Sequence, residues 1–145
     1  MFINVSELSR MELFPKALSC LVSGERIMMS FLDMEEGCVV PEHSHPHEQA
    51  GLVLEGVFRF RIGTDERITR AGDAFIVPAN VVHAGEVMEG PARVLDIFSP
   101  PREDYQDRYN NYAKTTNTTL WTEKEEKVEK KPAERFIDRR QMRWQ

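Results

Sequence analysis

The chain has 145 residues, of which 41% are hydrophobic and 30% charged, and a net charge of -5 at pH 7. This length suits one ordinary domain with its own core, and the composition is globular rather than disordered or fibrous. An acidic chain lacks the concentrated basic surface that nucleic-acid binding needs, so no nucleic acid is expected as a partner. No run of about 18 apolar residues and no signal-peptide pattern occurs, which predicts no membrane association and a cytoplasmic location.

Residues 17 to 98 predict many short β-strands separated by turns. The apolar or alternating runs are 26–32, 51–54, 57–62, 74–77 and 94–98. Turn sequences rich in Gly, Asp, Asn and Pro lie between them, at 36–37, 55–56, 63–66, 71–73, 78–80 and 89–91. These residue types supply the backbone geometry of tight reversals. Strands at this spacing indicate an all-β sandwich or barrel.

The run 57–62 alternates apolar and basic residues. Phe58 and Phe60 should therefore face one side of a half-buried strand, and Arg59 and Arg61 the other. We expect the two arginines to face solvent rather than to bind a substrate. The two cysteines, Cys20 and Cys38, form no C-x-x-C motif and are expected to be small core residues.

The residue pattern changes from short apolar runs to charged and aromatic residues after Pro100-Pro101. This change divides the chain into a barrel over 1–102 and a charged, partly helical arm over 103–145. The spacing of Tyr105, Tyr109 and Tyr112 predicts one face of a short helix. Residues 123–131 are almost all charged, which indicates a linker or an exposed helix. The arm carries all the tyrosines together with Trp121 and Trp144, so it packs on the barrel or a neighbouring subunit, or else is a frayed extension beyond 123.

All four histidines lie in two windows, 41–49 and 78–83. Residues two apart in a strand project to the same face, so His43 and His45 can present both imidazoles to one point. His83 would supply a third ligand and leave positions for water or substrate, as a catalytic metal requires. Spacing alone leaves a histidine cluster without metal as the alternative.

These two windows resemble the two motifs of the cupin superfamily. The first motif, G-x5-H-x-H-x3,4-E-x6-G, is matched at every interval by Gly37, His43, His45, Gln49 and Gly56, with glutamine in the glutamate position. The second motif, G-x5-P-x-G-x2-H-x3-N, is matched by Gly72, Pro78 and His83, with Asn80 and Val87 replacing its glycine and asparagine. The resemblance implies a double-stranded β-helix, or jelly-roll, barrel.

It also implies one divalent metal ion, held by His43, His45, Gln49 and His83. An amide in place of the usual carboxylate leaves the full charge on the ion, which favours Lewis-acid chemistry over oxygen activation. Glu48 is one residue off the family spacing and should point away from Gln49. His47 lies an even number of residues from His43 and His45, so on a strand it would face the same way and could also be a ligand. The motif spacing instead favours a place for His47 beside the ligands or against the substrate. Zinc, nickel, iron, manganese and copper all suit such donors.

Within the superfamily, residues 43–49, 51–56 and 95–104 look like the pectin-degradation cupins of the KdgF type, and the similarity covers about residues 20–105. Members of that family open the ring of 4,5-unsaturated uronates to the linear keto-uronate. The resemblance implies that Asp96 moves a proton, Arg102 holds the substrate carboxylate and Phe98 packs against the sugar. Alternatively, Asp96 orients a ligand histidine, and Arg102 forms a surface salt bridge with Glu103 or Asp104.

We therefore predict a metal-dependent lyase or isomerase of uronate metabolism that acts on a small anionic, sugar-like substrate. Another metal-dependent cupin enzyme, such as an isomerase or dioxygenase, and a non-catalytic cupin that binds a sugar or small anion are the alternatives, because the fold hosts all of them. Since cupins commonly pair and the arm is aromatic, we also expect a homodimer.

Overall fold

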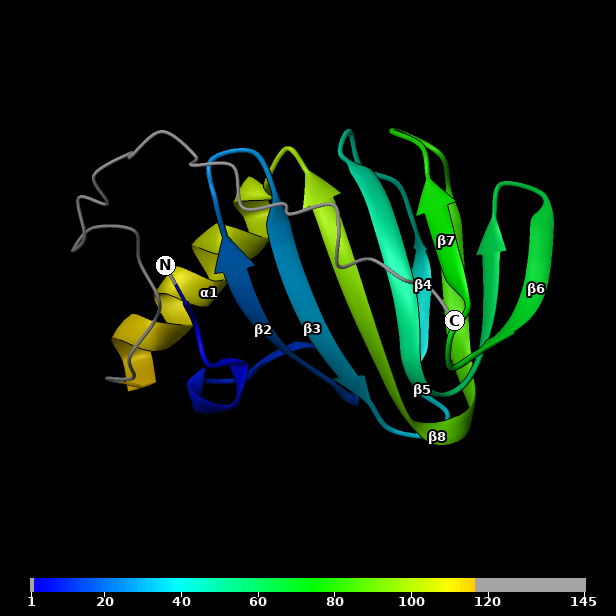
Figure 1. Cartoon of the computed structure of the whole chain (residues 1–145), viewed down its shortest axis with the longest axis horizontal. Helices are drawn as coiled ribbons and strands as arrows, with labels where there is room; N and C mark the ends of the chain where they lie inside the picture. The colour runs from blue at the N-terminus through cyan, green and yellow to red at the C-terminus, as the bar shows by residue number, and fades with distance from the viewer. Residues whose placement is uncertain (1, 117–145) are drawn as a thin grey trace, which may run out of the picture.

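Eight antiparallel strands curl into an open-ended barrel, and one helix follows them (Figure 1). This computed structural model describes residues 2–116, so the charged stretch 123–131, Trp121 and Trp144 lie outside the described residues. The elements are η1 (Val5–Glu7), β1 (Met11–Phe14), β2 (Ala17–Ser23), β3 (Met28–Met34), β4 (Val39–His43), β5 (Glu48–Ile62), β6 (Asp65–Arg70), β7 (Ala74–Val77), β8 (His83–Ser99) and α1 (Glu103–Thr116). The prediction of an all-β barrel with a C-terminal helix is confirmed.

The two longest strands, β5 and β8, each belong to both walls of the barrel. The order is β1-β2-β3-β8-β5-β6, with β4 on β8 and β7 on β5. The second half of β8 pairs with β3 and its first half with β4, while the first half of β5 pairs with β7 and its second half with β6. Because β5 and β8 also pair along most of their length, their shared bend folds the sheet over a core, which is the jelly-roll arrangement.

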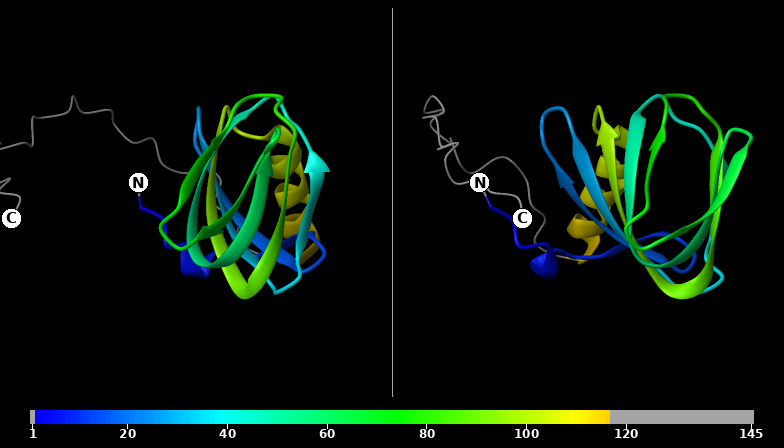
Figure 2. Two further views of the ribbon diagram at one scale, coloured as in Figure 1. Left: turned by 90° about the vertical axis from the view of Figure 1, so that its right-hand side faces the viewer. Right: turned by 45° about the vertical axis from the view of Figure 1, so that its right-hand side comes forward.

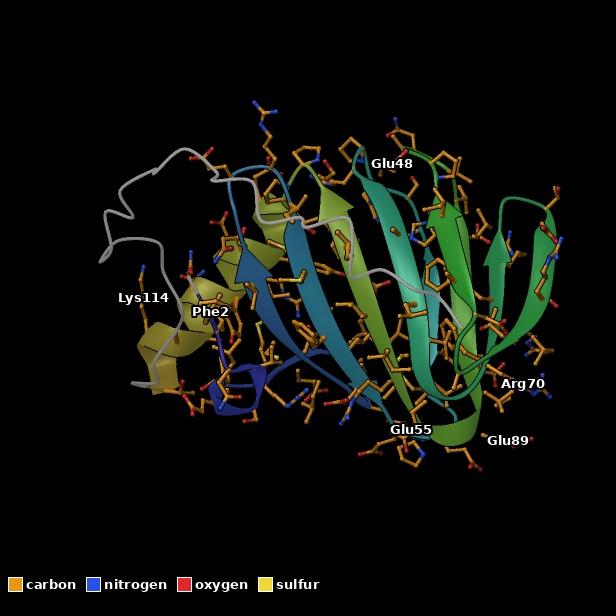
Figure 3. All side chains as sticks on the ribbon, in the orientation of Figure 1. Phe2, Glu48, Glu55, Arg70, Glu89 and Lys114 are labelled. Atoms are coloured by element: carbon orange, nitrogen blue, oxygen red, sulfur yellow. The ribbon has the colours of Figure 1, made fainter. Side chains whose placement is uncertain are left out.

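Glycines mark the place where these long strands bend. Gly56 has a φ of +86°, and a Cβ there would lie 2.7 Å from the Ala92 backbone. A Cβ on Gly90 would lie 2.6 Å from the Glu36 amide nitrogen. The sequence prediction of turns at 55–56 and 89–91 was wrong, because both strands continue through these residues. Glu55 and Glu89, beside the bends, lie at the end of the barrel opposite to Glu48 (Figure 3).

The alternation predicted for 57–62 is confirmed. Phe58 and Phe60 are buried and their rings stack inside the barrel. Arg59 and Arg61 point outward and form ion pairs with Glu86 and Glu42. The two cysteines are also as predicted, since both thiols are free and buried in the core.

Helix α1 folds back over the barrel rather than extending away from it. It contacts β2, and it lies on the same side of the β1–β3 sheet as β4 (Figure 2). The Tyr109 hydroxyl, on a residue only 1% exposed, donates a hydrogen bond of 2.7 Å to the Ser9 carbonyl oxygen. Tyr105 and Tyr112 pack against the core beside it, so the predicted tyrosine face is confirmed. Among residues 2–116 no helix is long and apolar enough to span a membrane.

Candidate metal centre and pocket

Three histidines from different segments converge at the Glu48 end of the barrel. His43 ends β4 and is the register partner of His83, which begins β8. His45 lies in the loop between β4 and β5, so the premise that it shares a strand face with His43 was wrong; the loop brings its ring into place instead. One ring nitrogen from each of His43, His45 and His83 lies within 4.8 Å of the other two. The predicted three-histidine cluster is confirmed.

Backbone carbonyls fix which nitrogen of each ring carries the proton. Nδ1 lies 2.7 Å from the Pro41 oxygen in His43, 3.0 Å from the His47 oxygen in His45, and 2.9 Å from the Val81 oxygen in His83. A carbonyl oxygen only accepts, so each Nδ1 donates and each Nε2 presents its lone pair. This is the orientation of a metal-ligating imidazole. Nε2 of His83 is buried and has no hydrogen-bond partner within the described part of the chain.

Gln49, the second residue of β5, completes a donor set that suits a cation. Its Nε2 donates to Asp96 Oδ1 at 2.8 Å, so its Oε1 is turned toward His45 Nε2 at 3.2 Å. Because the proton of His45 is on Nδ1, these facing atoms are both acceptors with no hydrogen between them. A divalent ion bound to both atoms would satisfy them, so the residues fit the metal that the sequence motifs imply. Glu48 is exposed at the start of β5 (Figure 3).

Burial keeps the imidazoles of His45 and His83 in the form that binds metal. It lowers the pKa of His45 to about 4, and the positive charge of Arg102 contributes in the same direction, as a proton on His83 would. Burial also lowers the pKa of His83. Both rings are therefore neutral at physiological pH.

Asp96 projects into the barrel from β8 and is 7% exposed. Burial raises its pKa to about 6, although the hydrogen bond from Gln49 and the charge of Arg102 act to lower it. The alternative in which Asp96 orients a ligand histidine does not hold, because the ring Nδ1 atoms of the cluster all bond to backbone oxygens. Asp96 instead fixes the amide of Gln49.

Arg102 lies between the barrel and α1 and is only 6% exposed. Its Nε and Nη2 donate to the two carboxylate oxygens of Asp104 at 3.1 and 2.6 Å, so the predicted salt bridge to Asp104 is present. Its Nη1 is nevertheless buried without a hydrogen-bond partner among residues 2–116. The guanidinium can thus be anchored on one side and still have an unused donor for an anion.

Phe98 packs against two of these groups. It is 2% exposed, its ring lies edge-on to His45 at 5.5 Å between centroids, and the Arg102 guanidinium carbon is 5.3 Å from its centroid. It is not among the residues that line the pocket, so its predicted contact with a sugar remains a prediction.

A pocket joins these polar groups to the aromatic interior of the barrel. Its polar lining comprises His43, His83, Gln49, Asp96, Arg102, Tyr105 and Ser30, and its apolar lining includes Phe58, Phe60, Phe75 and Val94. A concave apolar site with a few converging polar groups is the usual form of a small-molecule site. Candidate metal donors therefore share one pocket with the buried acid Asp96 and the cationic side chain of Arg102.

The sequence interpretation missed two contacts made by the first turn of α1. Tyr105 lines the pocket and was interpreted only as part of a helix face. Glu103 was considered only as a partner for Arg102, but its Oε2 lies 3.1 Å from Nε2 of His47, which is buried and outside the ligand cluster. The i, i+3 spacing of Arg102 and Tyr105 is the one signal that could have linked the helix to the site.

Comparisons with known proteins agree with this geometry. Residues 30–98 match the Cupin domain family. The pectin degradation protein KdgF of Dickeya dadantii (strain 3937) is 31% identical over 80 residues, which cover 54% of this chain and 73% of that protein. The structure of KdgF from Halomonas sp. matches with a TM-score of 0.67 and 29% identity, over 72% of this chain and 97% of that one. An RmlC-like cupin from Shewanella frigidimarina matches with a TM-score of 0.68 and 26% identity, over 72% and 94% of the two chains.

Proposed function

This chain belongs to the cupins and is a relative of the KdgF proteins, and on that basis we propose that it is a metal-dependent enzyme that opens the ring of 4,5-unsaturated uronates. One observation carries the proposal. His43, His83 and Gln49 line one pocket together with a buried acid and a buried arginine, and His45 lies within the same histidine cluster. The arginine has a donor without a partner among the described residues. A sugar acid offers the matching groups, namely hydroxyl oxygens for a metal and a carboxylate for the arginine.

Arg102 would bind the carboxylate of the substrate. Its Nη1 is buried without a hydrogen-bond partner among the described residues, which carries a desolvation penalty. An anion that accepts a hydrogen bond from Nη1 would remove that penalty. Asp104 and the ring of Tyr105 hold the guanidinium in one plane, which reduces the loss of side-chain freedom on binding.

Asp96 would carry the proton that the isomerisation requires. When the ring opens, the anomeric hydroxyl loses a proton, the bond between C1 and the ring oxygen breaks to leave an enolate, and C4 of that enolate gains a proton. Reactant and product therefore have the same composition, and one carboxylate can accept the first proton and return it at C4. Asp96 lines the pocket beside the metal donors, where it could serve both positions.

A metal ion bound by His43, His45, Gln49 and His83 would supply Lewis-acid polarisation of a substrate oxygen. The amide of Gln49 adds no negative charge to that donor set. This supports sugar chemistry over the dioxygenase alternative.

The test is to incubate the full-length, metal-loaded protein with unsaturated galacturonate and to follow the loss of its absorbance against the spontaneous rate. We expect a rate well above the spontaneous one, lost in Asp96→Asn and strongly reduced in Arg102→Lys. Arg61→Lys is the matched control, because that arginine pairs with Glu42 on the outside of the barrel. Equal rates with and without protein would refute the proposal, and uronate binding without turnover would indicate a non-catalytic binding cupin.

A further inference from the structure

The first turn of α1 is attached to the site at two points. Glu103 pairs with His47, whose own carbonyl oxygen is the acceptor that orients the His45 ring. Arg102, the residue before the helix, lies with its guanidinium carbon 3.6 Å from the centroid of the Tyr105 ring. The Tyr105 ring in turn meets Phe98 edge-on at 5.8 Å. The start of the helix therefore contacts the loop between β4 and β5, which carries His45, through Glu103, and it contacts Arg102 through Tyr105.

Tyr105 differs from the two other tyrosines on the same helix. Tyr109 is fully buried, with its hydroxyl bonded to the Ser9 carbonyl, and Tyr112 packs against the core away from the pocket lining. Tyr105 alone of the three lines the pocket, and its hydroxyl has no hydrogen-bond partner among residues 2–116. Burial raises the pKa of this phenol, so it stays protonated and is available as a donor.

We propose that Tyr105 is a substrate-positioning residue whose ring holds Arg102 flat and whose hydroxyl donates a hydrogen bond to the carboxylate of the bound uronate. The inference rests on the proposed function and deepens it. A guanidinium stacked on an aromatic face keeps its in-plane donors free for a carboxylate. The pocket then recognises the anion with two different donors, both supplied by the segment that begins at Arg102 and ends in the first turn of α1.

The two roles of Tyr105 can be separated by two substitutions. Tyr105→Phe keeps the stacking and removes the donor, so we expect KM for unsaturated galacturonate to rise about tenfold with kcat little changed, since one hydrogen bond to a charged group is worth roughly that factor. Tyr105→Leu also removes the stacking, so we expect a further fall in kcat as the carboxylate is held less firmly. Tyr112→Phe is the matched control and should leave both constants unchanged.

Binding of galacturonate, a saturated uronate that cannot react, is measured on the same full-length variants by calorimetry. This separates the two claims, because a wild-type protein that binds galacturonate but does not turn over unsaturated galacturonate would refute the proposed reaction and still test Tyr105. We expect about tenfold weaker binding for Tyr105→Phe, with a melting temperature equal to that of the wild type. Wild-type affinity and KM in Tyr105→Phe, with Arg102→Lys impaired, would overturn the inference. A wild-type protein that neither binds galacturonate nor turns over unsaturated galacturonate would overturn both.

Discussion

Replacing Gln49 with glutamate tests why this chain has an amide where cupins usually have a carboxylate. The Gln49 amide donates to Asp96 at 2.8 Å and turns its oxygen toward His45. A glutamate cannot donate when ionised, so Gln49→Glu would place two carboxylates at a hydrogen-bond distance inside the barrel. We therefore infer that the amide is needed because Asp96 is its neighbour.

The size of the effect follows from that distance. Two unit charges 2.8 Å apart repel by ~6 kcal/mol at an effective dielectric constant of ~20, before any relief. The pair relieves most of this by retaining one proton, which costs ~1.4 kcal/mol for each pH unit above the pKa of about 6 that Asp96 has beside the neutral amide. We expect Gln49→Glu to lose roughly 2–4 kcal/mol of unfolding free energy at pH 8, or about 10 °C in Tm.

The assay is thermal melting of chelator-treated protein at pH 5 and pH 8, because a bound metal would favour the new carboxylate and mask the repulsion. A shared proton raises the pKa of the pair in the folded state, so stability is retained at low pH and lost as the pH rises. The loss should therefore be small at pH 5. In the double variant Gln49→Glu with Asp96→Asn, the amide introduced on β8 can donate to the carboxylate introduced on β5 and should restore most of the stability. A Gln49→Glu protein with wild-type Tm at pH 8, or no recovery in the double variant, would show this explanation of the amide to be wrong.

Three further predictions concern the metal, the helix and the pocket wall. Chelation should abolish ring opening and lower Tm, since a ligand at about a thousandfold excess over its Kd stabilises by ~4 kcal/mol; an unchanged Tm would contradict a bound metal. Burial raises the pKa of Tyr109 to about 12, so the stability that this phenol contributes is complete below its unfolded pKa near 10 and lost between about pH 10 and 12. Tyr109→Phe should lower the free energy of unfolding, measured with urea, by ~1 kcal/mol at pH 7, and that free energy should fall less steeply above pH 10 than in the wild type. Wild-type and variant curves of unfolding free energy against pH that run parallel would contradict this. Gly51→Ala should cost ~1–3 kcal/mol and raise KM, because a Cβ there overlaps the Phe75 ring in the pocket wall; wild-type stability would contradict it.

The fixed intervals around the histidines made the ligand cluster predictable from sequence. Turn glycines and alternation likewise indicated a β-barrel, and β7 begins and ends at the residues predicted. The strand ends were less accurate at Gly56 and Gly90, because a glycine that permits a bend within a strand has the same local signature as one that ends it.

The surroundings of the ligands could not be predicted, because they depend on contacts between distant segments. The bond from Gln49 to Asp96 exists only once β5 and β8 pair. Tyr105 reaches the pocket because the chain turns back after Pro100-Pro101. The expected homodimer and cytoplasmic location rest on the family resemblance and on sequence patterns, and they stay predictions.

Ring opening by this chain is proposed to depend on one divalent metal ion held by His43, His45, Gln49 and His83. Elemental analysis of the purified full-length protein, paired with the uronate assay, tests this dependence, with His83→Ala as the variant. We expect about one metal ion per chain in the wild type, and loss of both metal and activity in His83→Ala. A metal-free wild-type protein that opens the ring at full rate would contradict the proposal.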